Sequence, residues 1–419
     1  MAAKNLAVSG EGWNAGPIPG DPKVEAKYSP PAQKLFMVSV LLTELDGALK
    51  ATWLSVSGQS PASGRSPPAS DFRNGPPVAL AVGSLQASLL PTTTTTNLRM
   101  RFLGGAEEEN LTVVTDFLLL GFSDLPELRL FLFLAFLLLY LAILAGNILL
   151  LGLLLTDGAL HFPMYFFLGN LSLLDLCFTA VTVSNTLANL LTGNRAISAT
   201  ACAVQVYFLL AFGSAECYLL VAMAFDRFVA ICSPLRYVAV MGRRTCVGLT
   251  VGSWFIGAPV FLGQTLWVFG LPFCRPREVG QTFCDVPPLL RLACTDTASH
   301  ELGTATMAAC FSALPFLLIL GSYMRVLGAL LRMPSAVGRQ KAFSTCSAHL
   351  LVVTLFYASC GAMYLRPKST FSLRNDRLLA LPYIFGTPLL NPLIYSLRNR
   401  DVKGALRRAV GRLSGSGRV

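Results

Sequence analysis

The sequence predicts an all-α membrane protein, a bundle of seven transmembrane helices, and two observations support this prediction. Hydrophobic residues make up 53% of the 419 residues and charged residues only 13%, whereas soluble domains carry about 25% charged residues. The apolar residues are also gathered into seven long runs. Such runs are stable in lipid as helices, because a helix satisfies its own backbone hydrogen bonds.

Each run is long enough to cross a membrane, since a hydrocarbon core of about 30 Å needs a helix of about 20 apolar residues. Polar residues separate the runs, for example Thr156-Asp157-Gly158 after the first and Pro334-Ser335 after the fifth. The predicted spans are 130–155, 164–191, 199–231, 247–271, 302–331, 343–365 and 378–397.

The positions of lysine and arginine predict the orientation, because loops rich in these residues stay in the cytoplasm. Basic residues follow the third and fifth spans and fill the carboxyl-terminal tail: Arg236, Arg243, Arg244, Arg332, Arg339, Lys341, Arg398, Arg400, Lys403, Arg407, Arg408, Arg412 and Arg418. The loop before the last span is basic too, with Arg366, Lys368, Arg374 and Arg377, so the rule indicates a preference only. We expect the amino terminus outside and the carboxyl terminus in the cytoplasm, where a net charge of +11 suits anionic lipid.

Three segments of different composition divide the chain. Residues 1–109 are rich in Pro, Gly, Ser and Thr, which is typical of a disordered segment. Residues 110–400 form the predicted seven-helix domain, and residues 401–419 form a basic cytoplasmic tail with a short amphipathic helix. Two interpretations of the first segment stay open: a tolerated disordered tail, or a gene-model or splice extension in front of an alternative start at Met100.

The eleven cysteines fall into two groups. Seven lie in or beside the spans, and we expect them to be small packing residues. Four lie on the predicted outer face, where oxidising conditions favour disulfides, and four thiols allow three pairings that spacing cannot choose among. These four are Cys202, Cys274, Cys284 and Cys294. On the same face, Asn110-Leu111-Thr112 is a glycosylation acceptor just before the first span.

A charged pair at the end of the third span carries the strongest functional signal. Asp226 and Arg227 stand inside the segment Met223 to Cys232, and charges beside an apolar run are costly unless they serve a function. With Ser233-Pro234-Leu235-Arg236-Tyr237, this segment resembles the motif that closes the third helix of olfactory receptors, a branch of the rhodopsin-like G-protein-coupled receptors.

The resemblance recurs in order over about 300 residues, and the ordered set is far more specific than any one motif. Its other segments are Gly146-Asn147, Pro163 to Ser172 with Asp175, Ser322-Tyr323, Lys341 to Leu350, and Pro388 to Asn399. Phe356-Tyr357 stands where most other rhodopsin-like receptors carry a tryptophan motif, which favours the olfactory branch. Phe228 and Gly169 depart from the usual Tyr and Ser, and we expect the hydroxyl lost at Phe228 to affect coupling efficiency.

The resemblance implies a receptor for a small, volatile, mostly apolar odorant. It implies coupling to a heterotrimeric G protein of the olfactory stimulatory type, with cyclic AMP as the signal. It places the protein in the plasma membrane as a multi-pass protein, in the cilia of olfactory neurons. It also implies disulfides between Cys202 and Cys284 and between Cys274 and Cys294. The alternative is a non-olfactory rhodopsin-like receptor for a lipid or a peptide.

Four polar residues at mid-membrane depth are expected to converge inside the bundle, because stranding any of them in lipid would cost about several kcal/mol. They are Asn147, Asp175, Glu216 and Asn391. Two carboxylates in a low dielectric would share a proton or a small cation. The resemblance implies a sodium and water site at Asp175 and Glu216 that stabilises the resting state, and a satisfied polar network without an ion is the alternative. No other cofactor is expected.

A second set of residues is expected to switch the receptor and contact the G protein. Arg227 can hold a closed state by pairing with Asp226 and then be released to a partner, which is the behaviour of a two-state element. Pro392 removes a backbone hydrogen bond in the seventh span, and Pro315 should bend the fifth. The complete set is Asp226, Arg227, Tyr323, His349, Asn391, Pro392 and Tyr395. Ordinary packing is the alternative for any single tyrosine.

The ligand pocket is expected at the outer half of the bundle, as an apolar chamber with few polar groups. Its predicted lining is Leu209, Leu210, Gly213, Ser214, Cys217, Met307, Phe311, Tyr357, Gly361, Tyr364 and Ile384. Core packing is the alternative for each aliphatic residue taken alone. Amine receptors of the wider family carry a carboxylate at the position of Leu209, so a charged monoamine lacks its counter-ion there.

Other classes of protein fit less well. A channel or transporter calls for polar pore-lining faces or internal repeats with broken helices, and the sequence has no such repeat. An enzyme calls for a metal motif, a nucleophile elbow or a phosphate loop, and none is present. A nucleic-acid partner is not expected, because no basic stripe with interleaved aromatic residues lies outside the spans.

Overall fold

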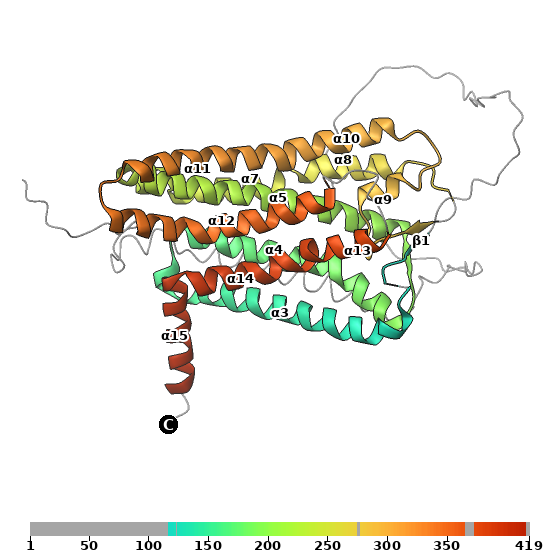
Figure 1. Cartoon of the computed structure of the whole chain (residues 1–419), viewed down its shortest axis with the longest axis horizontal. Helices are drawn as coiled ribbons and strands as arrows, with labels where there is room; N and C mark the ends of the chain where they lie inside the picture. Colours follow the sequence, from blue (N-terminus) through green and yellow to red (C-terminus); the bar gives the residue numbers. More distant parts are fainter. Residues whose placement is uncertain (1–115, 123, 275–276, 365–372, 416–419) are drawn as a thin grey trace, which may run out of the picture. The chain divides into compact units, whose positions relative to one another are not determined.

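The computed structural model describes residues 116–122, 124–274, 277–364 and 373–415. Within these residues, seven helical stretches are long and apolar enough to cross a membrane, and they run side by side in Figure 1. The predicted all-α bundle of seven spans is therefore confirmed. The extension 1–109, the alternative start at Met100 and the glycosylation site at Asn110 lie outside the described residues.

Three of the spans are single helices, and four combine shorter elements. The single helices are α4 (Pro163–Thr192), α5 (Ala199–Cys232) and α12 (Ala336–Tyr364). The first span joins η1 (Pro126–Leu128) to α3 (Arg129–Thr156), and the fourth joins α7 (Arg243–Phe255) to α8 (Ala258–Phe269). The fifth comprises α10 (Ala298–Ala308), η4 (Ala309–Ala313) and α11 (Leu314–Arg332), and the seventh comprises α13 (Leu373–Leu381), η6 (Pro382–Gly386) and α14 (Thr387–Arg398).

Two predicted boundaries differ from the structure at the charged end of the bundle. The sixth helix begins at Ala336 rather than at residue 343, and the fourth begins at Arg243 rather than at residue 247. A search for apolar runs stops at the first charges, whereas the helical backbone continues past the hydrocarbon layer. The connection between the fifth and sixth spans is consequently short, from Met333 to Ser335.

Helices α4 and α5 form the centre of the bundle. Helix α4 packs against α3 and α5, and α5 also packs against α7 and α11. Leucines such as Leu171, Leu173 and Leu219 on these two helices are completely buried, whereas α3 and α11 expose rows of large apolar side chains that suit lipid. Burial is greatest on α4 and α5, so a polar side chain on either must find a partner within the bundle.

Proline distorts the fifth and seventh spans. The π-helical turn η4 ends at Ala313, two residues before Pro315, and the π-helical turn η6 begins at Pro382. Such bulges often occur at functional sites, and both lie in the stretch expected to line the ligand chamber. Pro392 lies inside α14, and its ring rests against Gly146 on α3, where an added Cβ would lie only 3.2 Å from the ring. Helices α3 and α14 therefore approach closely because residue 146 lacks a side chain.

A small sheet, which the sequence analysis did not predict, covers one end of the bundle. Strand β1 (Asp116–Leu119) lies between β2 (Ala196–Ser198) and β3 (Glu278–Val279), antiparallel to the first and parallel to the second. Backbone hydrogen bonds continue past the strand, as from Leu120 N to Val279 O at 2.8 Å. We call this end the disulfide end, because Cys202 and Cys284 lie there, and the opposite end the Arg227 end.

Helix α15 (Arg400–Gly415) follows the seventh span at the Arg227 end and points away from the bundle axis in Figure 1. It presents an apolar side, with Val402 and Ala405 buried, and a charged side with Arg407 exposed. An ion pair of 2.7 Å between Arg408 and Asp157 ties it to the loop after the first span. This helix occupies most of the segment predicted to be a basic amphipathic tail.

Candidate functional site

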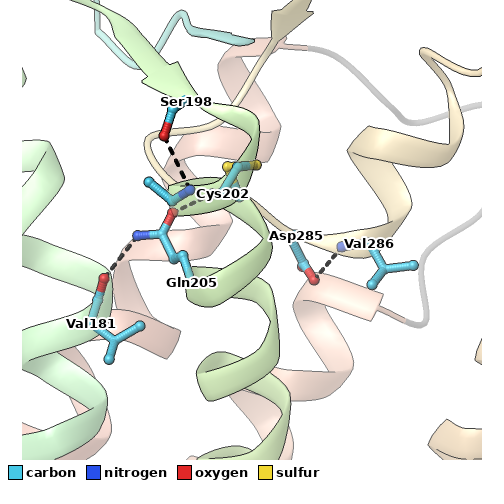
Figure 2. Close-up of a disulfide and its surroundings, with 8 residues drawn as sticks. Val181, Ser198, Cys202, Gln205, Asp285 and Val286 are labelled. Atoms are coloured by element: carbon cyan, nitrogen blue, oxygen red, sulfur yellow. Dashed lines mark hydrogen bonds between the residues drawn. A yellow bond between two sulfur atoms is a disulfide. The ribbon is translucent and has the colours of Figure 1, made fainter. Parts of the chain in front are cut away.

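Two disulfides fix the loop between the fourth and fifth spans, with the pairing that the resemblance implied. Cys202 at the start of α5 is bonded to Cys284, and Cys274 is bonded to Cys294. Gln205, one turn after Cys202, donates to the carbonyl of Val181 on α4 at 2.8 Å and accepts from the backbone N–H of Cys284 at 2.9 Å. Figure 2 shows how this one side chain links α4, α5 and the loop.

Asp285, the residue after Cys284, joins the loop to the sixth span. Its Oδ1 accepts from the backbone N–H of Val286, which begins the short helix α9 (Val286–Leu290), and its Oδ2 accepts from the hydroxyl of Tyr364 at 2.9 Å. The carboxylate is 1% exposed. Burial raises the pKa of Asp285 to about 6, although both hydrogen bonds act to lower it. The sequence analysis did not select Asp285, although a charged residue beside a disulfide cysteine was a usable signal.

Tyrosine side chains form one wall of the predicted chamber beneath this loop. The ring of Tyr364 packs edge-on against Tyr383, with 6.1 Å between the ring centres. An added Cβ at Gly213 on α5 would lie 3.4 Å from the hydroxyl of Tyr383. Tyr383 and its neighbour Ile384 belong to η6. The structure thus brings Gly213 and Tyr364 together around Tyr383, a wall residue that the sequence analysis missed, and Ile384 is buried next to Tyr383 in the chain.

A second group of predicted lining residues lies between α5, η4 and α12. Phe311 on η4 packs against Phe261 of α8 and Tyr218 of α5, with ring centres 4.9 and 6.2 Å apart. Tyr357 on α12 lies close enough to Cys217 on α5 for the two side chains to interact. The buried hydroxyl of Tyr357 forms no hydrogen bond to a nitrogen or oxygen atom of the described residues. It is therefore a polar group that can serve a ligand.

Other predicted lining residues occupy different surroundings. Ser214 donates to the carbonyl of Ala211 and lies against Gly257, at the junction of α7 and α8, so it packs between helices. Leu210 packs against the cluster under the sheet at the disulfide end. The remaining predicted residues are Leu209, buried in the main core, and Met307 and Gly361, half-buried on α10 and α12.

The mid-membrane polar residues are all buried, and two of them bond directly. The amide of Asn391 on α14 donates to both carboxylate oxygens of Asp175 on α4, at 2.9 and 3.2 Å. Glu216 on α5 interacts electrostatically with Asp175. Asn147 does not bond to either carboxylate, because its amide donates to the carbonyls of Ile143 and Pro388. Oxygen atoms of Asn147, Glu216 and Asn391 remain without a hydrogen-bond partner.

The charged pair at the Arg227 end is closed by a tyrosine. Arg227 pairs with Asp226 at 3.0 Å, and Asp226 also accepts from the hydroxyl of Tyr237 at 2.8 Å. Tyr237 begins α6 (Tyr237–Val240), the loop helix after the third span. Arg227 is only 8% exposed, so the guanidinium lies within the bundle. The ion pair is therefore covered by the residues around it.

A tyrosine–histidine contact joins the fifth and sixth spans beside this pair. Nε2 of His349 lies 3.2 Å from the carbonyl of Leu220, and Nδ1 lies 2.7 Å from the hydroxyl of Tyr323. A carbonyl can only accept, so Nε2 carries the proton and Nδ1 accepts from Tyr323. Tyr395 on α14 is completely buried, and its hydroxyl has no partner. Of the predicted switch residues, Asp226, Arg227, Tyr323 and His349 thus lie at the Arg227 end, whereas Asn391 lies at mid-membrane depth beside Asp175.

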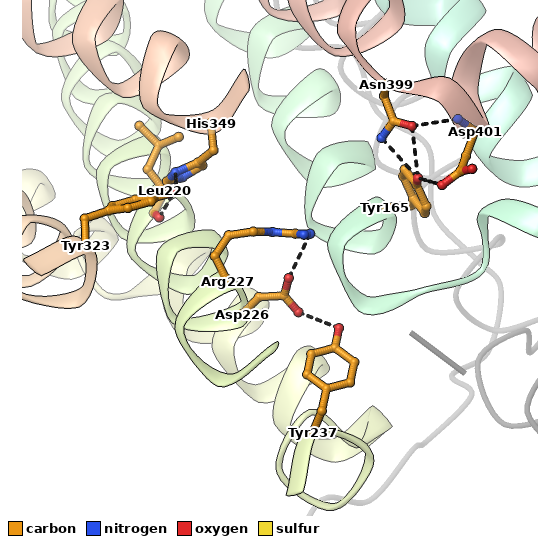
Figure 3. A network of polar contacts seen from close by, with 9 residues as sticks. All are labelled: Tyr165, Leu220, Asp226, Arg227, Tyr237, Tyr323, His349, Asn399 and Asp401. Carbon is orange, nitrogen blue, oxygen red and sulfur yellow. Dashed lines mark hydrogen bonds and ion pairs between the residues drawn. The ribbon is translucent and has the colours of Figure 1, made fainter. Parts of the chain in front are cut away.

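A further polar cluster at the Arg227 end was not predicted. The hydroxyl of Tyr165, at the start of α4, donates to Asp401 at 2.8 Å and accepts from the amide of Asn399 at 3.0 Å. Figure 3 shows this cluster across from the Arg227 pair. It anchors α15 to the second span. Tyr165 and Asn399 belong to the motifs quoted for the resemblance, but sequence alone does not show that they meet.

Seven spans, a buried charged pair at one end and a disulfide-fixed loop at the other define a G-protein-coupled receptor. The family model described as olfactory receptor matches residues 136–412. Human relatives include olfactory receptor 10A7, 50% identical over 302 residues, which are 72% of this chain and 96% of the relative. Olfactory receptor 10A4 is 49% identical over 309 residues, 74% of this chain and 98% of the relative. Olfactory receptor 10K1 is 45% identical over 305 residues, which are 73% of this chain and 97% of the relative.

The chain belongs to the olfactory receptor family. Membership confirms the resemblance seen in the sequence and the expectation that the protein is not an enzyme, because the family consists of receptors. It supports an odorant ligand and coupling to a G protein in general terms, and it does not favour a non-olfactory receptor for a lipid or peptide.

Proposed function

We propose that the protein binds a small, volatile, mostly apolar molecule between α5, η4, α12 and η6 and activates the stimulatory heterotrimeric G protein that raises cyclic AMP. In this proposal the disulfide end faces outside, the Arg227 end faces the cytoplasm, and the receptor works in the plasma membrane of olfactory cilia. The disulfides support an outside position for their end, because disulfides form and persist in oxidising compartments. The basic residues of α15 support a cytoplasmic position for the other end, because the cytoplasmic leaflet carries anionic lipid.

One observation carries the proposal: the helices that hold the predicted lining residues also hold the predicted switch residues. Helix α5 holds Gly213 near the disulfide end and Arg227 at the other, and α12 holds both Tyr357 and His349. A ligand that favours one arrangement of these helices at the chamber shifts the same helices at the Arg227 end. Such a ligand shifts the equilibrium toward the state that it binds more tightly, and the ratio of its two affinities limits the size of this shift.

The experiment is expression in cultured cells with a cyclic AMP readout against an odorant panel. Arg227→Ala should abolish the agonist response at unchanged surface level, because it removes the group that we propose is released to the G protein. Arg195→Ala is the matched control, since Arg195 is exposed at the disulfide end. Undiminished cyclic AMP from surface-expressed Arg227→Ala would refute the assigned role.

We propose further that Asp175 and Glu216 hold a sodium ion in the resting state. The residues present fit such an ion, because Glu216, Asn147 and Asn391 each leave a buried oxygen without a hydrogen-bond donor. Oxygen ligands suit hard cations, and a cation between two carboxylates would relieve their repulsion. The ion would supply positive charge alone.

Replacing sodium by choline at constant ionic strength tests this site. Agonist potency should rise several-fold in the wild type, because the resting state loses a ligand that stabilises it. Asp175→Asn should remove the sodium dependence. Equal potency of the wild type in both salts would favour the network without an ion.

A further inference from the structure

Asp285 is a fully buried carboxylate that has no cationic partner among the described residues. Its contacts are the backbone N–H of Val286 and the hydroxyl of Tyr364, both neutral donors. Burying an unpaired charge is costly. A carboxylate offers about four lone-pair positions, and two hydrogen bonds leave acceptor capacity for a further donor.

The surroundings of Asp285 lead toward the ligand chamber. Tyr364 donates a hydrogen bond to Asp285 and packs against Tyr383. The hydroxyl of Tyr383 in turn lies beside Gly213 on α5. Figure 2 shows the side chain of Asp285 pointing from the loop toward the helices, beside the first turns of α5. The carboxylate is therefore at the chamber end of the loop and beneath the sheet.

The groups that act on Asp285 are two hydrogen-bond donors, the hydroxyl of Tyr364 and the backbone N–H of Val286. Tyr364 on α12 and Tyr383 on η6 are the titratable groups that interact with it. On α5, Cys202 is held in the disulfide. On α10, which packs against α9, His300 stacks on Trp267 with 4.0 Å between the ring centres. Among the described residues, no cationic side chain thus neutralises the carboxylate of Asp285. A cationic group on a ligand would neutralise it.

We propose that Asp285 is the counter-ion for a protonated amine carried by an otherwise apolar odorant, an inference that rests on the odorant-binding function proposed above. The position of Leu209 on α5 offers no carboxylate, so the sequence argues against charged monoamines. The fold supplies the missing charge from the loop, at the residue that follows Cys284, whose disulfide partner Cys202 lies at the start of α5. An ammonium group would donate to Asp285 beside Tyr364, while its alkyl chain packs among the aromatic residues below.

The test uses three matched series, the n-alkyl amines, the n-alkyl alcohols and the n-alkyl carboxylates, on the full chain in cultured cells. At least one amine should act at a lower concentration than the alcohol of equal length, and the carboxylates should be the weakest. Asp285→Asn should weaken the amine about 10- to 100-fold, the range of a charge-assisted hydrogen bond, and leave the alcohol within about threefold. Asp285→Glu should restore part of the preference for amines.

Two further measurements separate a counter-ion from a structural role. Tyr364→Phe removes the bond to the loop but keeps the carboxylate, so the preference for amines over alcohols should persist. Burial raises the pKa of Asp285 to about 6, so lowering the outside pH from 7.4 to 5.5 protonates the carboxylate, while an alkylammonium with a pKa near about 10 stays charged. Amine potency should fall over this interval, and alcohol potency should not.

Two results would overturn the inference. One is an equal loss of potency for amine and alcohol in Asp285→Asn, and the other is an amine potency that changes with neither the mutation nor the pH. The odorant-binding function would still stand in either case, because the alcohols report on it independently. Failure of every member of a wide odorant panel, at normal surface level, would refute the odorant-binding function together with the inference.

Discussion

Gly213 shows how one residue limits the space available to a ligand. A methyl group at this position would touch the hydroxyl of Tyr383 at ordinary contact distance, 3.4 Å. Anything larger must displace Tyr383, which also packs against Tyr364 and Phe178. Because interiors are closely packed, the volume of residue 213 sets how near a ligand can approach α5.

We therefore predict that Gly213→Phe weakens or redirects the odorant response by about tenfold or more in potency, at similar surface level. Gly213→Ala should change potency little. Gly248→Phe is the matched control, because a Cβ at Gly248 meets nothing within 4 Å. Concentration–response curves with surface labelling measure the effect, and unchanged potency of Gly213→Phe would show that the pocket lies elsewhere.

At the scale of elements, the loop between the fourth and fifth spans acts as a lid held at several points. The disulfide to Cys202, the bond from Gln205 and the bond from Tyr364 attach it to α5 and α12. Thr186 on α4 adds a hydrogen bond to the carbonyl of Thr282 at 3.1 Å. The attachments come from α4, α5 and α12, so the complete set forms only when these three helices have packed together.

Cys202→Ser and Cys284→Ser should each sharply reduce delivery to the cell surface, because loss of such a bond typically costs about 2–5 kcal/mol in small secreted domains. The double variant should be no worse than either single variant, since both remove the same covalent bond. Cys310→Ser is the control, because Cys310 is free and exposed. Additive losses in the double variant, or normal delivery of the singles, would contradict the predicted role of the bond.

At the scale of the whole molecule, the segment before the first span is part of the folded domain. Phe117 and Leu119 are buried in the cluster under the sheet, where Phe117 packs edge-on against Phe273 at 5.2 Å. Arg377 at the start of the seventh span is paired with Asp124 and donates to the carbonyl of Gly280. That pairing neutralises one of the arginines that obscured the orientation in the sequence.

A chain that begins at Met100 should reach the surface as well as the full chain and respond to the same ligands, because it keeps β1. A chain that begins at Gly121 should lose most of its surface delivery, since β2 and β3 lose the strand between them. Phe117→Ala in the full chain should give an intermediate loss, about 3–5 kcal/mol in stability if the site behaves as a buried core position. Equal delivery of both shortened chains would show that the strand is dispensable.

The number and positions of the spans follow from sequence because membrane insertion depends on local apolar length. The predicted span 199–231 and the helix α5 differ by one residue at one end. Asp226 and Arg227 stand out as charges at the edge of an apolar run, which is why the sequence selects them as switch residues, and their role stays a prediction. The pairing of the four loop cysteines followed from the resemblance alone, since spacing left three connectivities open.

The sequence by itself thus determined the seven spans and the family, and it supplied the candidate residues of the site. Only the tertiary structure decided which of those residues meet: Asn391 with Asp175, Tyr237 with Asp226, Tyr165 with Asp401, and Asp285 with Tyr364. Three of these four contacts join residues more than 70 positions apart. Apolar periodicity reports how each helix meets lipid, but a contact between distant polar groups depends on the rotation and depth of both helices, which the packing of the whole bundle sets.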